Sequence, residues 1–383
     1  MRIHEINLQP AVGGGEIYTA KFSRAMAQAG AEVTLYVHGS NPFWRRLKEP
    51  RLAVIPVNDW REVHERLQDD GAIIMTQSRV PGDLAELWSR RHLLTGFAHM
   101  PMLGRSAAEF ARYSMVFTVS NYCIELLRKA GISRVYPEPL YGSSEVEDDH
   151  ETTGVTEIRA RSPYHWDKRK GRDRMLSALE PVARAILNPP IFTKRPGLTF
   201  GVVSLLSPIK QFPALFALIA PKIALVPGTH LEIFGNGGYA QVRDLRAALG
   251  PIARNARFWG YQQAVASIYP RLDYLLTGLP EKEALGLNVL EAQAAGTPVL
   301  APRAPPFTET IVDGVGGFLY TDPRQDGARD FERLLRDIHA GRSRPDPRAD
   351  KSHLARFSFA SMVERAGRVL GQLRNASAAR QDR

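Results

Sequence analysis

Two glutamates, Glu283 and Glu291, stand eight positions apart in the stretch EALGLNVLEAQAAGTPVLAP, residues 283–302, with Gly286 between them. The stretch follows an apolar run that predicts a strand, and its own apolar spacing predicts a helix opening near Leu285. Free backbone N–H groups at a helix N-terminus favour an anion, and a glycine there permits close approach. Taken alone, the pair also fits a plainer interpretation, in which Glu283 offsets the helix dipole and Glu291 is a solvated helix residue.

Other residues that could do chemistry also follow predicted strands. A glycine loop, VGGGE at 12–16, follows the first strand. His99 lies in GFAHMPM, and a second glycine loop, IFGNGG, spans 233–238. In an open α/β sheet ligands bind outside the carboxyl ends of strands, so these positions are candidates for one or more binding sites. Each glycine loop alone is equally consistent with a simple turn.

The first forty residues predict a strand, a glycine loop, an amphipathic helix that ends at Gly30, and a second strand. Such a unit repeated along the chain indicates a parallel sheet wound with helices. The pattern predicts an N-terminal domain over 1–145 and a second wound domain over 197–355. Between them, 146–196 is acidic, then basic, then proline-rich, and is predicted to be a linker with one helix over 173–187. A C-terminal helix over 356–376 is expected to pack back toward the N-terminal domain, followed by a frayed tail.

The chain has 383 residues, a formal net charge of +10 and a single cysteine, Cys123. One cysteine excludes an internal disulfide and suits a reducing compartment. The beginning of the sequence lacks the apolar core of a signal peptide, and no run approaches the length of a membrane span, which indicates a cytoplasmic protein. Nucleic acid is disfavoured because zinc-ligand spacing, RNP-like and KH-like motifs are missing. Phosphate-bearing small molecules and an anionic membrane surface remain candidate partners.

With these residues in view, the chain resembles the retaining glycosyltransferases of family 4. Their motif, two glutamates separated by seven residues, matches Glu283 to Glu291 and continues to Gly296, Pro298 and Val299. Further matches are GGGEIYTAKFSRAMAQAGAEVTLYV, VFTVSNYCIELLRKAGI, LSPIK and LEIFGNGG, so the resemblance covers nearly the whole chain outside 145–195. It implies the α/β fold called GT-B, in which two Rossmann-like, doubly wound domains face each other across a cleft.

The resemblance also implies roles. Glu283 would contact the donor sugar, Glu291 the ribose hydroxyls, and Lys210 the leaving diphosphate. His99 would meet the donor sugar from the N-terminal domain. The remaining donor-binding positions that it implies are Gly14, Gly15, Gly235, Asn236, Gly237, Leu285, Gly286 and Leu287. The donor would be a nucleotide sugar, most simply linked to UDP or GDP.

The sequence departs from the family pattern at Leu205, where an arginine usually provides a second cation for the diphosphate. The basic linker or Arg303 could supply this charge, donor binding could be weaker, or the chain could be a degenerate, non-catalytic binder. A sugar-nucleotide epimerase of the same fold is a further alternative. An NAD-dependent enzyme fits poorly, because the first glycine loop does not read G-x-G-x-x-G. No D-x-D motif is present, so no metal or other cofactor is expected, and transfer would proceed with retention by same-face substitution.

The stretch NPFWRRLKEPRL, residues 41–52, interleaves aromatic and basic residues. A basic, aromatic surface element attracts anionic lipid while its rings enter the headgroup region. A solvated charged loop is the simpler alternative. The membrane interpretation predicts a protein that is peripheral on the cytoplasmic face, with a saccharide or lipid-linked acceptor. The residues it places at the lipid surface are Phe43, Trp44, Arg45, Arg46 and Lys48.

Overall fold

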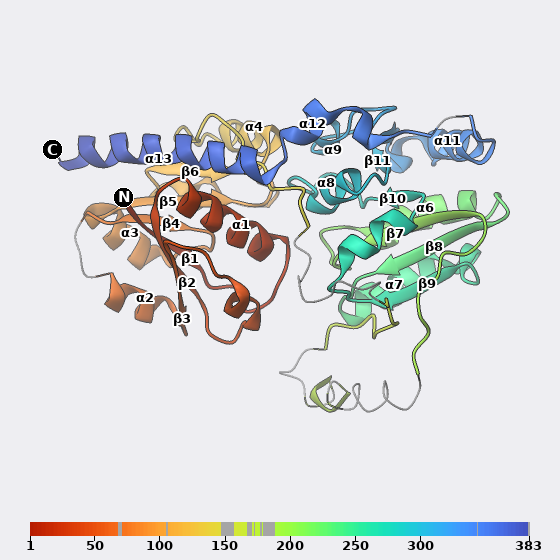
Figure 1. The fold of residues 1–383 in the computed structure, drawn as a ribbon, viewed down its shortest axis with the longest axis horizontal. Helices are drawn as coiled ribbons and strands as arrows, with labels where there is room; N and C mark the ends of the chain where they lie inside the picture. The colour runs from red at the N-terminus through yellow and green to blue at the C-terminus, as the bar shows by residue number, and fades with distance from the viewer. Residues whose placement is uncertain are drawn as a thin grey trace. The chain divides into compact units, whose positions relative to one another are not determined.

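The structure is a computed structural model in which residues 1–67, 71–104, 106–146, 157–166, 171, 173–176, 178, 188–342 and 344–381 are described (Figure 1). The chain divides into two compact units. Unit 1 contains Met1–Ser143 and Ala355–Arg383, and unit 2 contains Ser144–Leu354. Both units are built on a parallel sheet with helices on its faces, as the alternation of strand and helix patterns predicts.

Unit 1 holds a six-stranded sheet of order β3-β2-β1-β4-β5-β6. All neighbouring strands pair in parallel. The strands are β1 Arg2–Asn7, β2 Glu32–His38, β3 Leu52–Val57, β4 Ile73–Thr76, β5 Leu93–Ala98 and β6 Met115–Thr118. Chain direction diverges at the centre, because β1 leads to β2 on one side and β4 leads to β5 on the other. This divergence is the doubly wound arrangement predicted from the sequence.

The helices of unit 1 bury apolar faces against this sheet. They are α1 Gly14–Gln28, α2 Trp60–Arg66, α3 Gly82–Arg91, α4 Asn121–Lys129 and the C-terminal helix α13 Phe359–Gln381. Helix α4 is capped by Ser120, whose Oγ accepts from the N–H of Cys123. Cys123 itself is buried.

The C-terminal helix α13 belongs to unit 1 and packs against α1, beside which it runs in Figure 1. It continues to Gln381, so the predicted end at residue 376 with a frayed tail is wrong. The last turn is held because the Arg380 guanidinium donates to the carbonyl of Ser89 at 2.7 Å. That contact cannot be read from a local sequence pattern, since it joins residues 291 positions apart.

Unit 2 repeats the same winding with the order β12-β11-β10-β7-β8-β9. Its strands are β7 Leu198–Val203, β8 Thr229–Phe234, β9 Ala256–Gly260, β10 Tyr274–Leu276, β11 Val299–Pro302 and β12 Gly317–Tyr320. Its helices are α6 Phe212–Ile223, α7 Tyr239–Ala248, α8 Leu287–Ala294, α9 Phe307–Thr310, α10 Pro323–Asp326 and α11 Arg329–His339, with α12 Lys351–Ala355 at its end. One large core lies between β7, β8 and helices α6, α7 and α11.

The described part of 146–196 groups with unit 2 rather than standing apart as a linker. Its two pieces pair with each other, as the N–H of Phe192 donates to Ile158 O at 2.8 Å. Ile158 and Phe192 are both buried in a core cluster with Trp259. The helix predicted over 173–187 falls largely outside the described residues.

The basic, aromatic stretch near residue 44 differs from its predicted exposure. A 3-10 turn over Pro42–Arg46 is capped by Asn41, whose side chain accepts from the N–H of Phe43. The turn directs Trp44 inward, where it is 2% exposed and packs with Ala20, Leu35 and Val37. The prediction that Trp44 enters a membrane is therefore wrong, because burial against α1 and β2 already removes its apolar surface from water. Phe43 is half-buried.

The basic side chains of the same stretch keep their predicted exposure. They are Arg45, Arg46 and Lys48. Among the described residues, no helix combines the length and the apolarity that a membrane crossing requires.

Candidate functional site

The loops that leave β7 and β10 lie side by side in unit 2. These two strands pair in parallel, and the chain then turns to β8 from one and to β11 from the other. The carboxyl ends of two such diverging strands form the crevice where open α/β sheets bind ligands. The loop after β7 carries Lys210, and the loop after β10 carries Glu283.

Glycine at 278 brings the two loops together. A Cβ at Gly278 would lie 2.1 Å from the carbonyl oxygen of Lys210, so only glycine allows this approach. The N–H of Leu279 donates to that same carbonyl at 3.2 Å. The two backbones are thereby fixed against each other, and their side chains project from neighbouring positions.

Lys210 and Glu283 form an ion pair, in which the Lys210 ammonium donates to Glu283 Oε2. The side chains are 21% and 13% exposed, so the pair is shielded from most of the solvent while staying reachable by a ligand. Charges in such a partly desolvated position interact more strongly than surface charges do. The structure thus joins two residues that lie 73 positions apart in sequence.

The other oxygen of Glu283 is bound by backbone amides. Glu283 Oε1 accepts from the N–H groups of Ala284 and Gly286, both at 3.2 Å. The Glu283 carboxylate is therefore held by one lysine and one motif amide that the family resemblance assigns to a diphosphate. In the corner between the two loops, a lysine and backbone amides thus hold a carboxylate of the chain itself.

Helix α8 begins at Leu287, two residues later than predicted. Gly286 precedes it with φ of +81°, a left-handed conformation that strains any residue with a Cβ. Asn288 in the first turn donates from Nδ2 to the carbonyl of Val203 at 3.1 Å, which ties the helix to the end of β7. The helix N-terminus is thereby anchored at the strand ends, and Leu285 is buried behind it.

Glu291 lies further along α8 and pairs with a residue that the sequence did not single out. The hydroxyl of Tyr269 donates to Glu291 Oε2 at 2.7 Å, and Tyr269 is fully buried. Burial, followed by the charge of Glu291, raises the pKa of Tyr269 well above its ordinary value. Tyr269 thus stays a hydrogen-bond donor and fixes the Glu291 carboxylate. Tyr269 lies outside the glutamate motif, and no local pattern distinguishes it.

The loop that carries Glu283 is braced by an acidic pair around one arginine. Arg324 donates to both carboxylate oxygens of Glu281, at 2.7 and 2.9 Å, and also to Asp322. These hydrogen bonds hold the pKa of the Glu281 and Asp322 carboxyls below their ordinary values. The brace fixes the loop two residues before Glu283.

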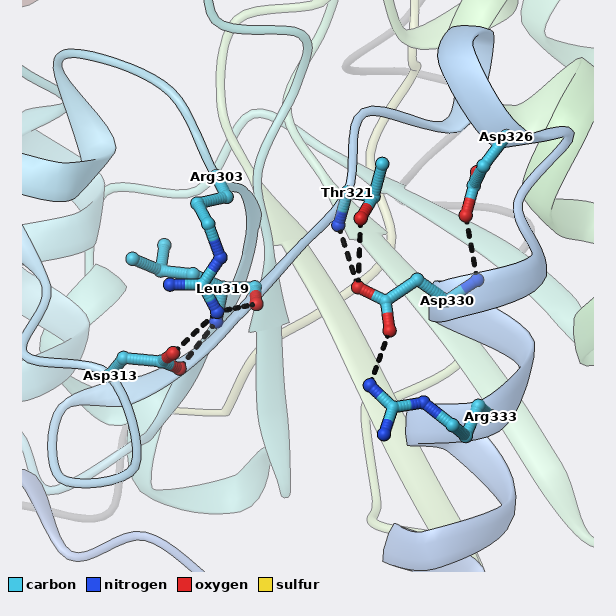
Figure 2. A network of polar contacts seen from close by, with 7 residues as sticks. All are labelled: Arg303, Asp313, Leu319, Thr321, Asp326, Asp330 and Arg333. Carbon is cyan, nitrogen blue, oxygen red and sulfur yellow. Dashed lines mark hydrogen bonds and ion pairs between the residues drawn. The ribbon is translucent and has the colours of Figure 1, made fainter.

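Leu205 occupies the position of the missing arginine and is 47% exposed. Of the two substitutes considered for its charge, Arg303 is engaged elsewhere: its guanidinium donates to Asp313 Oδ2 at 2.5 Å and to Leu319 O at 2.8 Å, as Figure 2 shows. The other substitute, the basic stretch 159–174 of the linker, is described in part: Arg159 donates to Glu157 Oε2 at 2.5 Å, and 167–170 and 172 lie outside the described residues. The neighbouring cluster in Figure 2, in which Asp330 accepts from the N–H and hydroxyl of Thr321, fixes the start of α11.

The glycine loop after β8 serves backbone packing. A Cβ at Gly235 would lie 1.8 Å from Ser204 O, and one at Gly237 would lie 2.2 Å from Leu206 O. The N–H of Gly235 donates to Gly260 O, and that of Gly237 donates to Pro163 O. These two amide donors are already used within unit 2, so the N–H groups of Gly235 and Gly237 are not available to a ligand, and the approach of these backbones to a nucleotide stays a prediction. The prediction for Asn236 is untouched by these contacts, although its carbonyl accepts from Leu206 N.

In unit 1, Gly14 and Gly15 form the first turn of α1, directly after β1. The N-cap residue is Gly13, whose N–H donates to Glu16 Oε2 at 2.8 Å. A Cβ at Gly15 would meet nothing within 4 Å, so open space lies beside this turn. That space is compatible with the predicted ligand contact.

His99 follows β5 at the carboxyl edge of the unit 1 sheet and is half-buried. Its ring stacks on Phe97, with centroids 5.3 Å apart, and its Nε2 is hydrogen-bonded to Gln77 Oε1. Gln77 in turn donates to Glu5 Oε1 at 2.5 Å. Glu5 and Gln77 are not among the residues predicted from the sequence. The available signal was an acidic residue in the middle of an apolar strand, where a charge is rarely placed.

Among the residues described, no group of three or more His, Cys, Asp or Glu side chains has an arrangement that could hold a metal ion.

Comparison with known proteins agrees with this architecture. Residues 198–350 match the family described as glycosyl transferases group 1. The chain is 28% identical to the D-inositol 3-phosphate glycosyltransferase of Corynebacterium diphtheriae over 207 residues, which are 49% of this chain and 45% of that protein. A second relative of the same name, from Corynebacterium kroppenstedtii, is 38% identical over 104 residues, 25% of this chain and 21% of its own. The chain thus matches less than half the length of these curated relatives.

Solved structures share the fold over nearly the whole chain. HepE of Anabaena, in complex with UDP and glucose, superposes with a TM-score of 0.69 at 17% identity and covers 97% of this chain and 100% of its own. Sucrose-phosphate synthase from Thermosynechococcus elongatus gives 0.67 at 16% identity, covering 98% and 100%. Residues 198–350 are therefore similar to the glycosyl transferases group 1 family, and the chain has the GT-B fold.

Proposed function

We propose that this chain is a retaining glycosyltransferase that moves a sugar from a nucleoside diphosphate donor, UDP- or GDP-linked, to a saccharide acceptor. The observation that carries the proposal is the corner between the β7 and β10 loops, where Lys210 and the Gly286 amide, groups that also bind phosphate, hold the Glu283 carboxylate. Glu291 lies on the helix that begins at this corner. Cation, helix N-terminus and carboxylate are the three contacts that a nucleoside diphosphate sugar requires.

Lys210 and the amides of Leu285 to Leu287 would receive the diphosphate, whose negative charge grows as the glycosidic bond breaks. Fixed donors that meet this developing charge lower the barrier. Glu283, released from Lys210, would hold the hydroxyls of the donor sugar. The departing phosphate oxygen would take the proton of the acceptor hydroxyl as that hydroxyl attacks on the same face. The protein would supply positioning and charge stabilisation.

The relatives support a nucleotide-sugar donor without fixing its identity. HepE was solved with UDP and glucose and with UDP-glucose, and the pneumococcal O-GlcNAc transferase GtfA with UDP and GlcNAc. Two curated relatives are D-inositol 3-phosphate glycosyltransferases. A cytoplasmic role in the synthesis of cell-envelope polysaccharide or glycolipid is the proposed setting.

The experiment is a thermal-shift screen of UDP-, GDP-, ADP- and dTDP-sugars, followed by NMR analysis of the anomeric configuration of the product. A ligand at 100 times its Kd adds about 2.7 kcal/mol to the free energy of unfolding. We expect one nucleotide class to raise Tm and its sugar to be transferred with retention. Binding without transfer to any saccharide acceptor would identify a non-catalytic binder, and an inverted product would refute the same-face mechanism.

Replacing Leu205 by arginine is expected to tighten donor binding. The side chain is already 47% exposed, so a guanidinium there need not be desolvated before it reaches the diphosphate. A charged hydrogen bond contributes about 1.5–3 kcal/mol, which corresponds to a roughly tenfold or larger drop in donor Kd by calorimetry. Leu225→Arg, at a leucine of the same unit that is 60% exposed, is the charge-matched control. Equal tightening in both variants would show a general charge effect instead.

Transfer is expected to be independent of divalent metal. The proposed site neutralises the diphosphate with Lys210 and backbone amides. Initial rates after exhaustive treatment with EDTA should equal those of the untreated enzyme. Loss of activity that Mg²⁺ or Mn²⁺ restores would contradict this prediction.

We also propose a weak, electrostatic attachment to anionic membranes through Arg45, Arg46 and Lys48, now without insertion of Trp44. Each basic residue near such a surface contributes about 1 kcal/mol, and the attraction is screened by salt. We expect sedimentation with phosphatidylserine vesicles but not phosphatidylcholine vesicles at low salt. Replacing the three residues by serine should abolish it, whereas serine at Arg128, Lys129 and Arg134 should not. Equal binding to both vesicle types would rule the attachment out.

A further inference from the structure

A carboxylate is buried in the middle of the first strand of unit 1. Glu5 lies on β1 between the apolar positions Ile3 and Ile6 and is fully buried. Removing a carboxylate from water is costly unless hydrogen bonds replace the lost hydration. Burial accordingly raises the pKa of Glu5 to about 7. A buried carboxylate with this energetic cost suggests a function for Glu5. The site described in unit 2 does not involve Glu5.

Hydrogen bonds connect Glu5 to the carboxyl edge of the sheet. Glu5 Oε2 accepts from the Ser23 hydroxyl of α1 at 2.5 Å, and Glu5 Oε1 accepts from Gln77 Nε2 at 2.5 Å. Gln77 follows β4, the strand paired with β1, and its own N–H donates to Ile6 O. Its side-chain oxygen reaches His99 Nε2, after β5. Glu5 on β1, Gln77 after β4 and His99 after β5 therefore form one polar chain of hydrogen-bonded side chains across three neighbouring strands.

The direction of these hydrogen bonds follows from the chemistry of the groups. An ionised carboxylate only accepts, so the amide NH₂ of Gln77 must face Glu5. The carbonyl end of the same amide then faces His99, and it can only accept as well. His99 must therefore carry a proton on Nε2, and in the neutral ring Nδ1 is the accepting nitrogen. Glu5 thus determines, through Gln77, which nitrogen of His99 donates.

We propose that Glu5 and Gln77 are positioning residues for His99, which hold its ring in one orientation with Nε2 protonated. The inference rests on the proposed function and on the contact with the donor sugar that the family resemblance implies for His99. Neither Glu5 nor Gln77 needs to touch substrate. The stacked Phe97 and the edge of Tyr18, with centroids 5.3 and 5.2 Å from that of His99, restrain the ring plane, while the polar chain sets its proton.

A spectroscopic signature tests the polar chain independently of catalysis. In protein labelled with ¹⁵N-histidine at pH 8.5, above the pKa of Glu5, the His99 Nε2–H resonance should be sharp and protected from exchange. Assignment uses His99→Ala. Gln77→Leu should abolish this resonance, and Glu5→Gln should weaken it, because an amide at position 5 no longer forces Gln77 to face one way. Unchanged exchange in both variants would overturn the proposal.

Turnover tests the use of the chain in transfer. Misplacing a working histidine costs roughly 10- to 100-fold in rate, so Glu5→Gln should lower kcat by about this factor with little change in the KM of the donor. The double variant Glu5→Gln with Gln77→Glu exchanges the two groups and restores the polarity. The new amide at position 5 can then donate to the new carboxylate at position 77, whose other oxygen accepts from His99. We expect this double variant to recover turnover.

The structural control for these variants is Thr95→Val. Thr95 lies on β5, and its buried hydroxyl donates to the carbonyl of Ile74 on β4 at 2.9 Å. The substitution therefore removes a buried hydrogen bond between the same strands without altering the polar chain. Its turnover and its His99 resonance should stay near wild type.

The outcomes separate this inference from the proposed function. A variant with wild-type unfolding free energy, altered His99 exchange and reduced kcat supports it. Full turnover in His99→Ala overturns the positioning role even if nucleotide sugars still bind and are transferred. A wild-type protein that binds no nucleotide sugar contradicts the proposed function instead, while the resonance still reports whether Glu5 and Gln77 fix the ring.

Discussion

Replacing Lys210 by alanine is expected to lower kcat roughly 10²- to 10³-fold, the usual cost of removing one group that stabilises developing charge. The Lys210 side chain is 21% exposed and lies in the loop that follows β7, so its ammonium would act in a partly desolvated crevice. Its effect on donor affinity should be smaller. Donor binding must first break the Lys210–Glu283 ion pair, and this cost offsets part of the attraction between Lys210 and the diphosphate of the bound donor. The additional negative charge that forms in the transition state is stabilised by Lys210 without a further cost of this kind.

Lys222→Ala is the matched control for this prediction. Lys222 lies on α6, which follows the Lys210 loop, and also pairs with a glutamate, Glu332, at 2.7 Å. We expect this variant to keep wild-type kcat and KM. Steady-state kinetics with varied donor separate the two parameters. Wild-type turnover in Lys210→Ala would show that another cation neutralises the leaving group, and equal losses in both variants would indicate a general defect of the unit.

The periodicity of the sequence was sufficient for the architecture. Strands alternating with helical patterns predicted two wound sheets, and the structure has two sheets of identical winding. Such patterns predict secondary structure because each helix or strand buries one face, and this burial requires a regular spacing of apolar residues in the local sequence. The prediction failed where tertiary contacts decide. Trp44 stands among arginines, yet it fills a hollow between α1 and β2, and α13 is extended by a contact from Arg380 to the end of α3.

The candidate site was predictable in part for the same reason. The two motif glutamates could be named from residue type and spacing, and Lys210 from the family resemblance. The Lys210–Glu283 ion pair, however, depends on the close approach of two loops at Gly278. Gly235 and Gly237 show how little a glycine alone specifies. A glycine next to a strand end indicates close approach without saying what approaches, and here the neighbour is backbone of the same unit. Tyr269 and Glu5 act through long-range hydrogen bonds, which leave no periodic signal.

Replacing Glu291 by glutamine is expected to weaken the binding of nucleoside diphosphate by about 1.5–3 kcal/mol, the contribution of a charged hydrogen bond. In the proposed site the Glu291 carboxylate accepts from the ribose hydroxyls. The hydroxyl of Tyr269 already occupies Oε2, which orients the carboxylate without neutralising it. Glutamine has nearly the same shape as glutamate, so the loss of affinity reports the contribution of the negative charge. Calorimetry with the free nucleoside diphosphate is the appropriate measurement, since it excludes contributions from the sugar and from turnover.

Two further variants make this result specific. Tyr269→Phe removes the hydrogen bond that orients Glu291 but leaves the carboxylate, so we expect a smaller loss of nucleotide affinity than in Glu291→Gln. Glu332→Gln neutralises an ion-paired glutamate on α11 and should leave nucleotide affinity unchanged. Because Glu291 is bound to a fully buried tyrosine, the unfolding free energy of each variant must be measured alongside. A folded Glu291→Gln protein with wild-type affinity for the nucleoside diphosphate would remove Glu291 from the ribose site, and the motif would then retain only its anion corner at Lys210 and Gly286.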